Sequence, residues 1–214
     1  MVKWQVVKWL CYGAVMMGMT TGEAVFADTL EGTFTFTKRA PKVALVYFPE
    51  DESLPVDTST LVDQKNEQFT KRLLVTRKGV KATFQNSDAV NHNIFAHDEK
   101  AGVKFDIGLM APGGSVQQEI TWEEQVVRCG CKIHPKMRLW IASISSRYYQ
   151  TIEFEKKAKT ASFTIENIPE TLSKIKVWMP KYDPAEVALK AGETREISLV
   201  RKKKPRGVLQ LTRK

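Results

Sequence analysis

The chain has 214 residues, of which 43% are hydrophobic, and a formal net charge of +9 at pH 7. This composition is sufficient for a real core and excludes a disordered or collagen-like chain. Most of the positive surplus lies in residues 201–214, which hold seven cations and no carboxylate. We interpret this segment as a solvated basic tail, with contact to anionic lipid or to an acidic partner protein as the alternatives.

The N-terminus has the layout of a secretory signal. Lys3 and Lys8 form a short positive region before an uncharged run, and Val25 and Ala27 then place small residues where a signal peptidase reads. This layout predicts a signal peptide over residues 1–27, cleaved after Ala27. The alternative is a retained anchor, which needs about 18 or more apolar residues, and this run is shorter. Because an exported chain seldom meets nucleic acid, we expect no nucleic acid partner.

The body of the chain has the pattern of β-structure almost throughout. Short apolar or alternating segments, separated by Gly, Pro, Asn and Asp clusters, predict a β-sandwich or barrel. The predicted strands are residues 32–37, 43–48, 80–84, 91–96, 116–121, 125–131, 139–145 and 149–154. Between the second and third strands, the polar residues 49–71 predict a long loop with room for one helical turn.

The last third of the chain predicts four more short strands. They are residues 162–168, 174–179, 186–189 and 194–199, with a turn at 190–193. These strands are compatible with a second small sandwich or with an extension of the first. The two strands within residues 32–48 are compatible with either unit.

Two cysteines, Cys129 and Cys131, remain once the signal segment is removed. Alternate residues of a strand lie about 6.6 Å apart with parallel side chains, whereas a disulfide needs Cβ atoms about 4 Å apart. The two thiols are therefore not expected to pair with each other, although thiols in an oxidising compartment normally pair. An unpaired thiol in an exported protein indicates a metal ligand.

Cys131, His134 and Met137 place a thiolate, an imidazole and a thioether within seven residues at the end of a predicted strand. Such soft ligands favour copper, and Cys with two His and a weak axial Met forms the blue-copper site. His92 is the candidate for the second imidazole. It lies on the opposite strand face from His97, which opens into a charged loop and is interpreted as an exposed polar residue.

Zinc bound by both cysteines and two histidines is the alternative metal. Both thiols would then have to bind from one strand face, and Met137 would be idle. Cys129 is interpreted as a buried core thiol that packs as a small hydrophobe. The alternatives for Cys129 are a second sulfur ligand, part of a dinuclear copper centre, or a disulfide to another protein.

Residues 62–143 resemble the plastocyanin-like cupredoxins, and most of all the exported bacterial proteins labelled methylamine-utilisation-like. The likeness is carried by an ordered set of motifs, each weak alone. They are Asn86-Ser87-Asp88 leading to His92-Asn93, then Phe105-Asp106-Ile107-Gly108, Pro112-Gly113, and the segment from Cys131 to Met137. Residues 163–178 look more loosely like the carboxypeptidase-regulatory-like β module that often follows in that group.

This resemblance implies an all-β chain with a Greek-key cupredoxin β-sandwich and a small additional C-terminal β module. The implied parts are N-terminal strands and a loop over 28–60, a copper-binding domain over 61–147, the C-terminal module over 148–200 and the basic tail over 201–214. One copper ion, cycling between Cu(I) and Cu(II), would be held by His92, Cys131, His134 and Met137. Asn93 would hydrogen-bond near the thiolate and pin the ligand loop. The implied location is the periplasm.

The chain departs from the group's pattern at three places. Trp122-Glu123-Glu124 stands where a Pro-Gly usually precedes the ligand strand, which suggests an altered turn. Lys136 stands where the group often has an aromatic residue, so that a positive charge lies beside the metal. Cys129 is extra.

The expected function is that of an exported type 1 (blue) copper protein that carries single electrons between redox partner proteins, with His134 as the electron port by family likeness. The alternative is a periplasmic copper-handling protein that binds Cu(I) and exchanges it with donor or acceptor proteins, as a chaperone, scavenger or resistance factor. A β protein whose site has decayed is a third possibility. The sequence contains no acid–base pair or Ser/His/Asp arrangement, so we expect no enzymatic activity.

Overall fold

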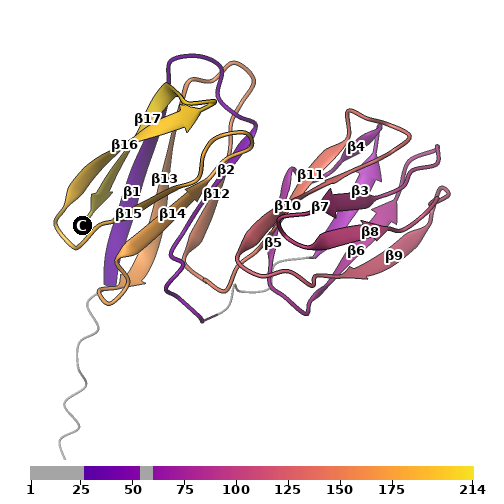
Figure 1. Cartoon of the computed structure of the whole chain (residues 1–214), viewed down its shortest axis with the longest axis horizontal. Helices are drawn as coiled ribbons and strands as arrows, with labels where there is room; N and C mark the ends of the chain where they lie inside the picture. The colour runs from indigo at the N-terminus through magenta and orange to yellow at the C-terminus, as the bar shows by residue number, and fades with distance from the viewer. Residues whose placement is uncertain (1–26, 54–59) are drawn as a thin grey trace, which may run out of the picture.

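The computed structural model describes residues 27–53 and 60–214, so that all of the predicted signal peptide except Ala27 lies outside the described residues. Every regular element in the described part is a β-strand, which confirms the predicted all-β class. None of the described residues forms a helix that could span a membrane. The strands build two β-sandwiches that lie side by side (Figure 1).

The first sandwich, here called the central sandwich, is formed by residues 61–143 and encloses one apolar core. One of its sheets has the order β4-β3-β6-β9 and the other has the order β5-β11-β10-β7-β8. The strands of the first sheet are β3 (Leu61–Lys65), β4 (Gln68–Phe69), β6 (Lys81–Asn86) and β9 (Ser115–Glu119). Those of the second are β5 (Leu73–Thr76), β7 (Phe95–Asp98), β8 (Val103–Asp106), β10 (Gln125–Gly130) and β11 (Arg138–Ser143).

The second sandwich, here called the terminal sandwich, takes its strands from both ends of the chain and has its own core. Its sheets have the orders β13-β1-β17-β16 and β12-β2-β14-β15. The first contains β1 (Ala27–Phe36), β13 (Thr160–Pro169), β16 (Thr194–Arg201) and β17 (Lys204–Arg213). The second contains β2 (Val43–Tyr47), β12 (Tyr149–Glu153), β14 (Lys174–Trp178) and β15 (Ala185–Ala188).

Strand β2 packs against both sandwiches, and all five of its residues are buried. Ala44 and Val46 point into the core of the terminal sandwich, whereas Leu45 and Tyr47 point to the other face. There they pack in one cluster with residues of the central sandwich, Val75, Ala142 and Ile144. The rings of Trp140 and Trp178 meet edge-to-face at 5.2 Å beside this cluster. A continuous apolar run therefore serves two cores at once.

The strands of the predicted N-terminal segment 28–60 are integral to the C-terminal β unit. β1 pairs with β13 and β17, and β2 pairs with β12 and β14, all antiparallel. The question that the sequence left open for residues 32–48 is thereby answered in favour of the C-terminal unit. These residues belong to the C-terminal unit because the inward side chains of β1, such as Phe34 and Phe36, are buried in the core that its partner strands form.

The interpretation of residues 201–214 as a solvated tail is wrong. Residues Lys204–Arg213 form β17, which lies between β1 and β16 in the interior of a sheet. Leu209 and Leu211 are fully buried on its inner face; Lys204 and Arg206 precede them, and Arg213 is buried after them on the same inner face. In the sequence, the many cations of this segment obscure a period-two apolar pattern that continues to Leu211.

Two further predictions differ in detail. The predicted loop 49–71 contains strands β3 and β4, because β3 pairs in parallel with β6 and buries Val62 and Gln64. The predicted strand 91–96 is regular only from Phe95, and His92 instead forms an isolated bridge with Met110. The altered turn before β10 holds Glu124 at a φ of 51°, in the left-handed region that glycine adopts most easily.

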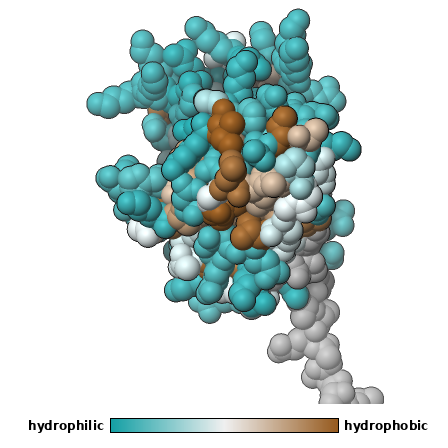
Figure 2. All heavy atoms as spheres, turned by 90° about the vertical axis from the view of Figure 1, so that its right-hand side faces the viewer, coloured by the Kyte–Doolittle hydropathy of each residue, from teal (hydrophilic) through white to brown (hydrophobic). Residues whose placement is uncertain are grey.

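The exposed large apolar side chains of the described residues all belong to the central sandwich. They are Leu61, Val90, Leu109 and Ile133. Figure 2 views this end of the molecule and shows apolar side chains gathered in the middle of a hydrophilic face. Apolar surface of this kind on one face marks a candidate contact region.

Arg213 joins several segments of the terminal sandwich through buried hydrogen bonds. Its side chain is fully buried, and its Nε donates to Asp28 Oδ2 at 2.7 Å. Its terminal nitrogens donate to the carbonyl oxygens of Pro169, Leu172 and Leu189. The last strand, the first strand and two loops are thus joined by one satisfied cation.

We expect Arg213→Ala to lower the free energy of unfolding by about 3–5 kcal/mol, because it leaves the Asp28 carboxylate buried without its partner. Urea denaturation followed by circular dichroism measures this. Lys214→Ala is the matched control, since Lys214 pairs with Glu31 at an exposed site and such pairs contribute about 0–1 kcal/mol. Equal losses for both variants would contradict the role given to Arg213.

Candidate metal centre

Two segments far apart in the sequence supply the candidate ligands. His92 lies between β6 and β7, where its backbone N–H and C=O both bond to Met110, at 3.0 and 2.7 Å. Cys131 directly follows β10, and His134 and Met137 lie in the loop between β10 and β11. That loop is tightened by the bond from the Met137 backbone N–H to the His134 carbonyl at 2.9 Å. A hairpin loop and a bridged segment therefore hold the four candidate ligands at one end of the central sandwich.

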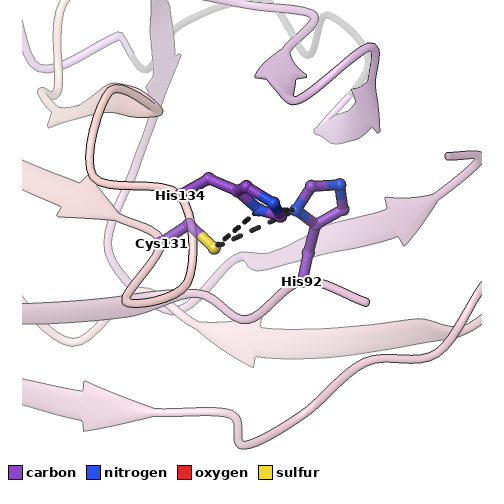
Figure 3. Close-up of side chains that lie close together, drawn as sticks. All are labelled: His92, Cys131 and His134. Atoms are coloured by element: carbon purple, nitrogen blue, oxygen red, sulfur yellow. Dashed lines mark hydrogen bonds between the residues drawn. The ribbon is translucent and has the colours of Figure 1, made fainter. Parts of the chain in front are cut away.

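The side chains of His92, Cys131 and His134 converge (Figure 3). Nδ1 of His92 lies 2.9 Å from Nδ1 of His134, and Cys131 Sγ lies 3.9 and 3.8 Å from these two nitrogens. His92 and Cys131 are buried, and His134 is half-buried. One edge of the site is thus open to solvent through His134.

This arrangement fits a metal ion. The point equidistant from the three ligand atoms lies about 2.1 Å from each, which is close to metal–nitrogen and metal–sulfur bond lengths of about 2.0–2.3 Å. A thiolate with two imidazoles is a donor set that suits copper or zinc. The residues present therefore have both the spacing and the chemistry of a metal site.

Asp88 orients the imidazole of His92 from behind. Its Oδ2 lies 3.1 Å from His92 Nε2, and because a carboxylate only accepts, Nε2 carries the proton and Nδ1 keeps its lone pair. The backbone N–H of Glu67 and the imidazole of His92 hold the pKa of Asp88 below its ordinary value, so it stays ionised at neutral pH. A carboxylate behind a ligating imidazole fixes the tautomer and makes the ligand more basic.

Asn93 connects the two ligand segments. Its Oδ1 accepts the backbone N–H of Lys132 at 2.7 Å, and its Nδ2 donates to Asp106 Oδ1 at 3.1 Å. The ammonium of Lys132 bonds to the other oxygen of Asp106. Asn93 therefore links the segment that holds His92 to the loop that begins at Cys131.

Asn86 and Asp88 support the candidate metal site from behind His92, although along the sequence they stand out only as part of a motif. Asn86 is fully buried and donates through Nδ2 to the carbonyls of Val90 and Met110, at 2.9 and 3.0 Å. Its Oδ1 accepts the backbone N–H of Asp88 at 3.0 Å. The available signal was the spacing of four residues between Asp88 and His92, with a turn-forming Asn two residues earlier.

The other candidate residues are placed as follows. Met137 is buried in the core of the central sandwich together with Cys131. Cys129 is fully buried in the same core, and it is not one of the residues whose ligand atoms lie within 4.8 Å of one another. Burial raises the pKa of the Cys129 thiol to about 12, which keeps it protonated. A Cys₂His₂ zinc site is therefore not assembled, and the side chain of His97 is 57% exposed.

No family model matches the chain, and no curated protein sequence matches it. Solved structures of cupredoxins are similar to parts of it. A purple cupredoxin from Nitrosopumilus maritimus is 19% identical over 39% of this chain and 97% of its own, with a TM-score of 0.34. A reduced amicyanin mutant is 21% identical over 46% of this chain and 97% of its own, with a TM-score of 0.36.

A copper-containing nitrite reductase from Thermus scotoductus SA-01 is also similar. It is 21% identical over 42% of this chain, with a TM-score of 0.36, but the match spans only 22% of that enzyme. The structural neighbours are thus cupredoxins at low identity, and each match covers less than half of this chain.

We expect Asp88→Asn to weaken metal binding by about 10–100-fold, because His92 loses the anionic acceptor that fixes its tautomer. Competition against a chromophoric chelator, with Cu(II) as the probe, measures the affinity. Glu99→Gln removes the same charge at a side chain that is 89% exposed and serves as the control. Affinities that are equal in the two variants would remove Asp88 from the site.

Proposed function

We propose that the chain is an exported, periplasmic type 1 (blue) copper protein that carries one electron at a time between redox partner proteins. The observation that carries this proposal is the convergence of Cys131 Sγ and the two Nδ1 atoms of His92 and His134 at one buried corner. One copper ion, as Cu(I) or Cu(II), would be held by these atoms, with Met137 as a weak axial ligand.

The surroundings of the site suit electron transfer because they resist rearrangement. His92 is fixed at its backbone by Met110 and at its ring by Asp88. The ligand loop is fixed by the bond between Lys132 and Asn93. Bound copper would supply a one-electron couple, and ligands that do not move on oxidation or reduction lower the cost of each transfer.

His134 provides the path for the electron. It is the one half-exposed member of the group, whereas His92 and Cys131 are buried. Its chain neighbour Ile133 is 46% exposed, and Leu109, next to the Met110 that bridges His92, is 69% exposed. An apolar rim of this kind suits brief contact with a partner protein, since apolar contacts need no fixed geometry and release readily.

Copper handling is the second candidate, because a thiolate and a thioether also suit Cu(I). In this role the protein would bind Cu(I) and exchange it with a donor or acceptor protein. The burial of Cys129 weighs against it, since a second accessible thiolate is then lacking among the described residues. The proposed role of the metal is to accept and release an electron, so no catalytic step is assigned to the protein.

The visible absorption spectrum of the protein loaded with Cu(II) tests the proposal. We expect a strong band at about 600 nm from the Cu(II)–thiolate bond. Cys131→Ser should abolish the band. Cys129→Ala is the matched control and should keep it, because its thiol lies outside the ligand group.

A colourless protein that still binds Cu(I) tightly would overturn the electron-carrier role and leave copper handling. A band lost equally in both cysteine variants would show that Cys129 takes part in the site. A protein that binds neither oxidation state would remove both candidates.

A further inference from the structure

A cavity of about 490 Å³ lies between the two sandwiches, and seven of its lining residues are cations. Among the described residues, no carboxylate lines it. We propose that this cavity binds a small, multiply charged oxyanion, one that carries several phosphate or carboxylate groups. The proposed ligand is distinct from the metal, but the two sites adjoin, because Met137, the proposed axial metal ligand, also lines the cavity.

The central sandwich contributes one wall of the cavity. Arg72 stands directly before β5, and Lys136 and Arg138 lie at the end of the ligand loop and the start of β11. Phe69 and Trp140 supply apolar surface between these cations. All three cationic side chains are exposed to solvent, so they are free to reorient toward a ligand.

The terminal sandwich contributes the opposite wall. Arg39 and Lys42 come from the connection between β1 and β2, Lys181 from the connection between β14 and β15, and Arg201 from the end of β16. Tyr182 lies beside them, with its ring packed edge-to-face on Phe36. Cations from five separate segments are therefore brought to one space only by the docking of the two sandwiches.

The charges of this cavity are poorly compensated from within the molecule. In the described part of the chain, Arg72 forms an ion pair with Glu153 at 3.8 Å, and no ion pair is formed by the other six cations. Like charges gathered around one cavity oppose the folded state. An anion that binds between them removes this repulsion and stabilises the folded protein.

The cations extend beyond the main cavity. A second hollow of about 260 Å³ shares Arg39, Lys42 and Arg72 with it and adds Lys156 together with one carboxylate, Glu155. A third, of about 300 Å³, is lined by Arg39, Lys156, Lys157 and Lys159. Because several charges lie along one path, a ligand with several anionic groups is favoured over one with a single charge.

The side chains indicate the class of ligand. Four of the seven cations in the main cavity are arginines, whose planar guanidinium matches the paired oxygens of phosphate and carboxylate groups. The volume falls within the range of about 300–1,000 Å³ that is typical of small-molecule sites. A recess of this size, walled on two sides, suits a small anion better than the flat surface of an acidic protein.

Isothermal titration calorimetry on the metal-free, full-length protein tests the proposal, with inorganic tripolyphosphate and citrate as the probes. We expect saturable binding of at least one probe, and the two probes distinguish phosphate from carboxylate preference. The double variant Arg138→Gln with Lys181→Gln removes one cation from each wall. It should weaken binding by about 10–100-fold, since the anion loses a charge-assisted hydrogen bond to each wall. Far-UV circular dichroism checks that the variant is folded.

Lys104→Gln with Lys190→Gln is the matched control, because it removes the same charge at exposed residues that do not line the cavity. Its affinity should equal that of the unaltered protein. Equal weakening in both double variants would reduce the effect to overall charge and overturn the proposal. So would binding of a polyglutamate peptide with no binding of either small anion, which would assign the cavity to an acidic partner protein. Because these titrations use metal-free protein, neither outcome depends on the electron-carrier role.

Discussion

The hydrogen bond between the Asn93 side chain and the Lys132 backbone joins the two segments of the candidate metal centre. At 2.7 Å it joins two positions 39 residues apart, each directly following a candidate ligand. His92 precedes one partner and Cys131 precedes the other, so this bond, together with the pairing of β7 with β10, sets their separation. Asp106 then receives both the amide of Asn93 and the ammonium of Lys132, which closes the connection.

The ligand loop has two faces, and the two sandwiches use them differently. Cys131 and His134 turn toward His92, whereas Lys136 and Arg138 line the cavity next to the terminal sandwich. All four candidate metal ligands belong to the central sandwich. The cationic cavity needs both, and it exists because the buried outer face of β2 and the edge-to-face tryptophans hold the sandwiches in contact.

Cations occur in this protein in two physical states. Arg213 is buried and must be satisfied internally, so it pairs with Asp28 and three carbonyl groups. Of the seven cations of the cavity, six are exposed and Arg201 is half-buried, so water can solvate them until an external anion binds. Because burial removes water from Arg213, its internal hydrogen bonds are required for the folded state. The cations of the cavity keep their water and remain available for binding.

Period-two alternation and ligand spacing are local properties, so the sequence by itself determined the all-β class and which metal-binding residue types stand at positions 92, 131 and 134. Only the tertiary structure decided that β17 lies inside a sheet beside β1, because strand pairing depends on contacts between residues up to 185 positions apart. The role of Asp88 and the cationic cavity were likewise decided by packing. Their residues are chemically ordinary along the chain and become distinctive only when distant segments are brought together.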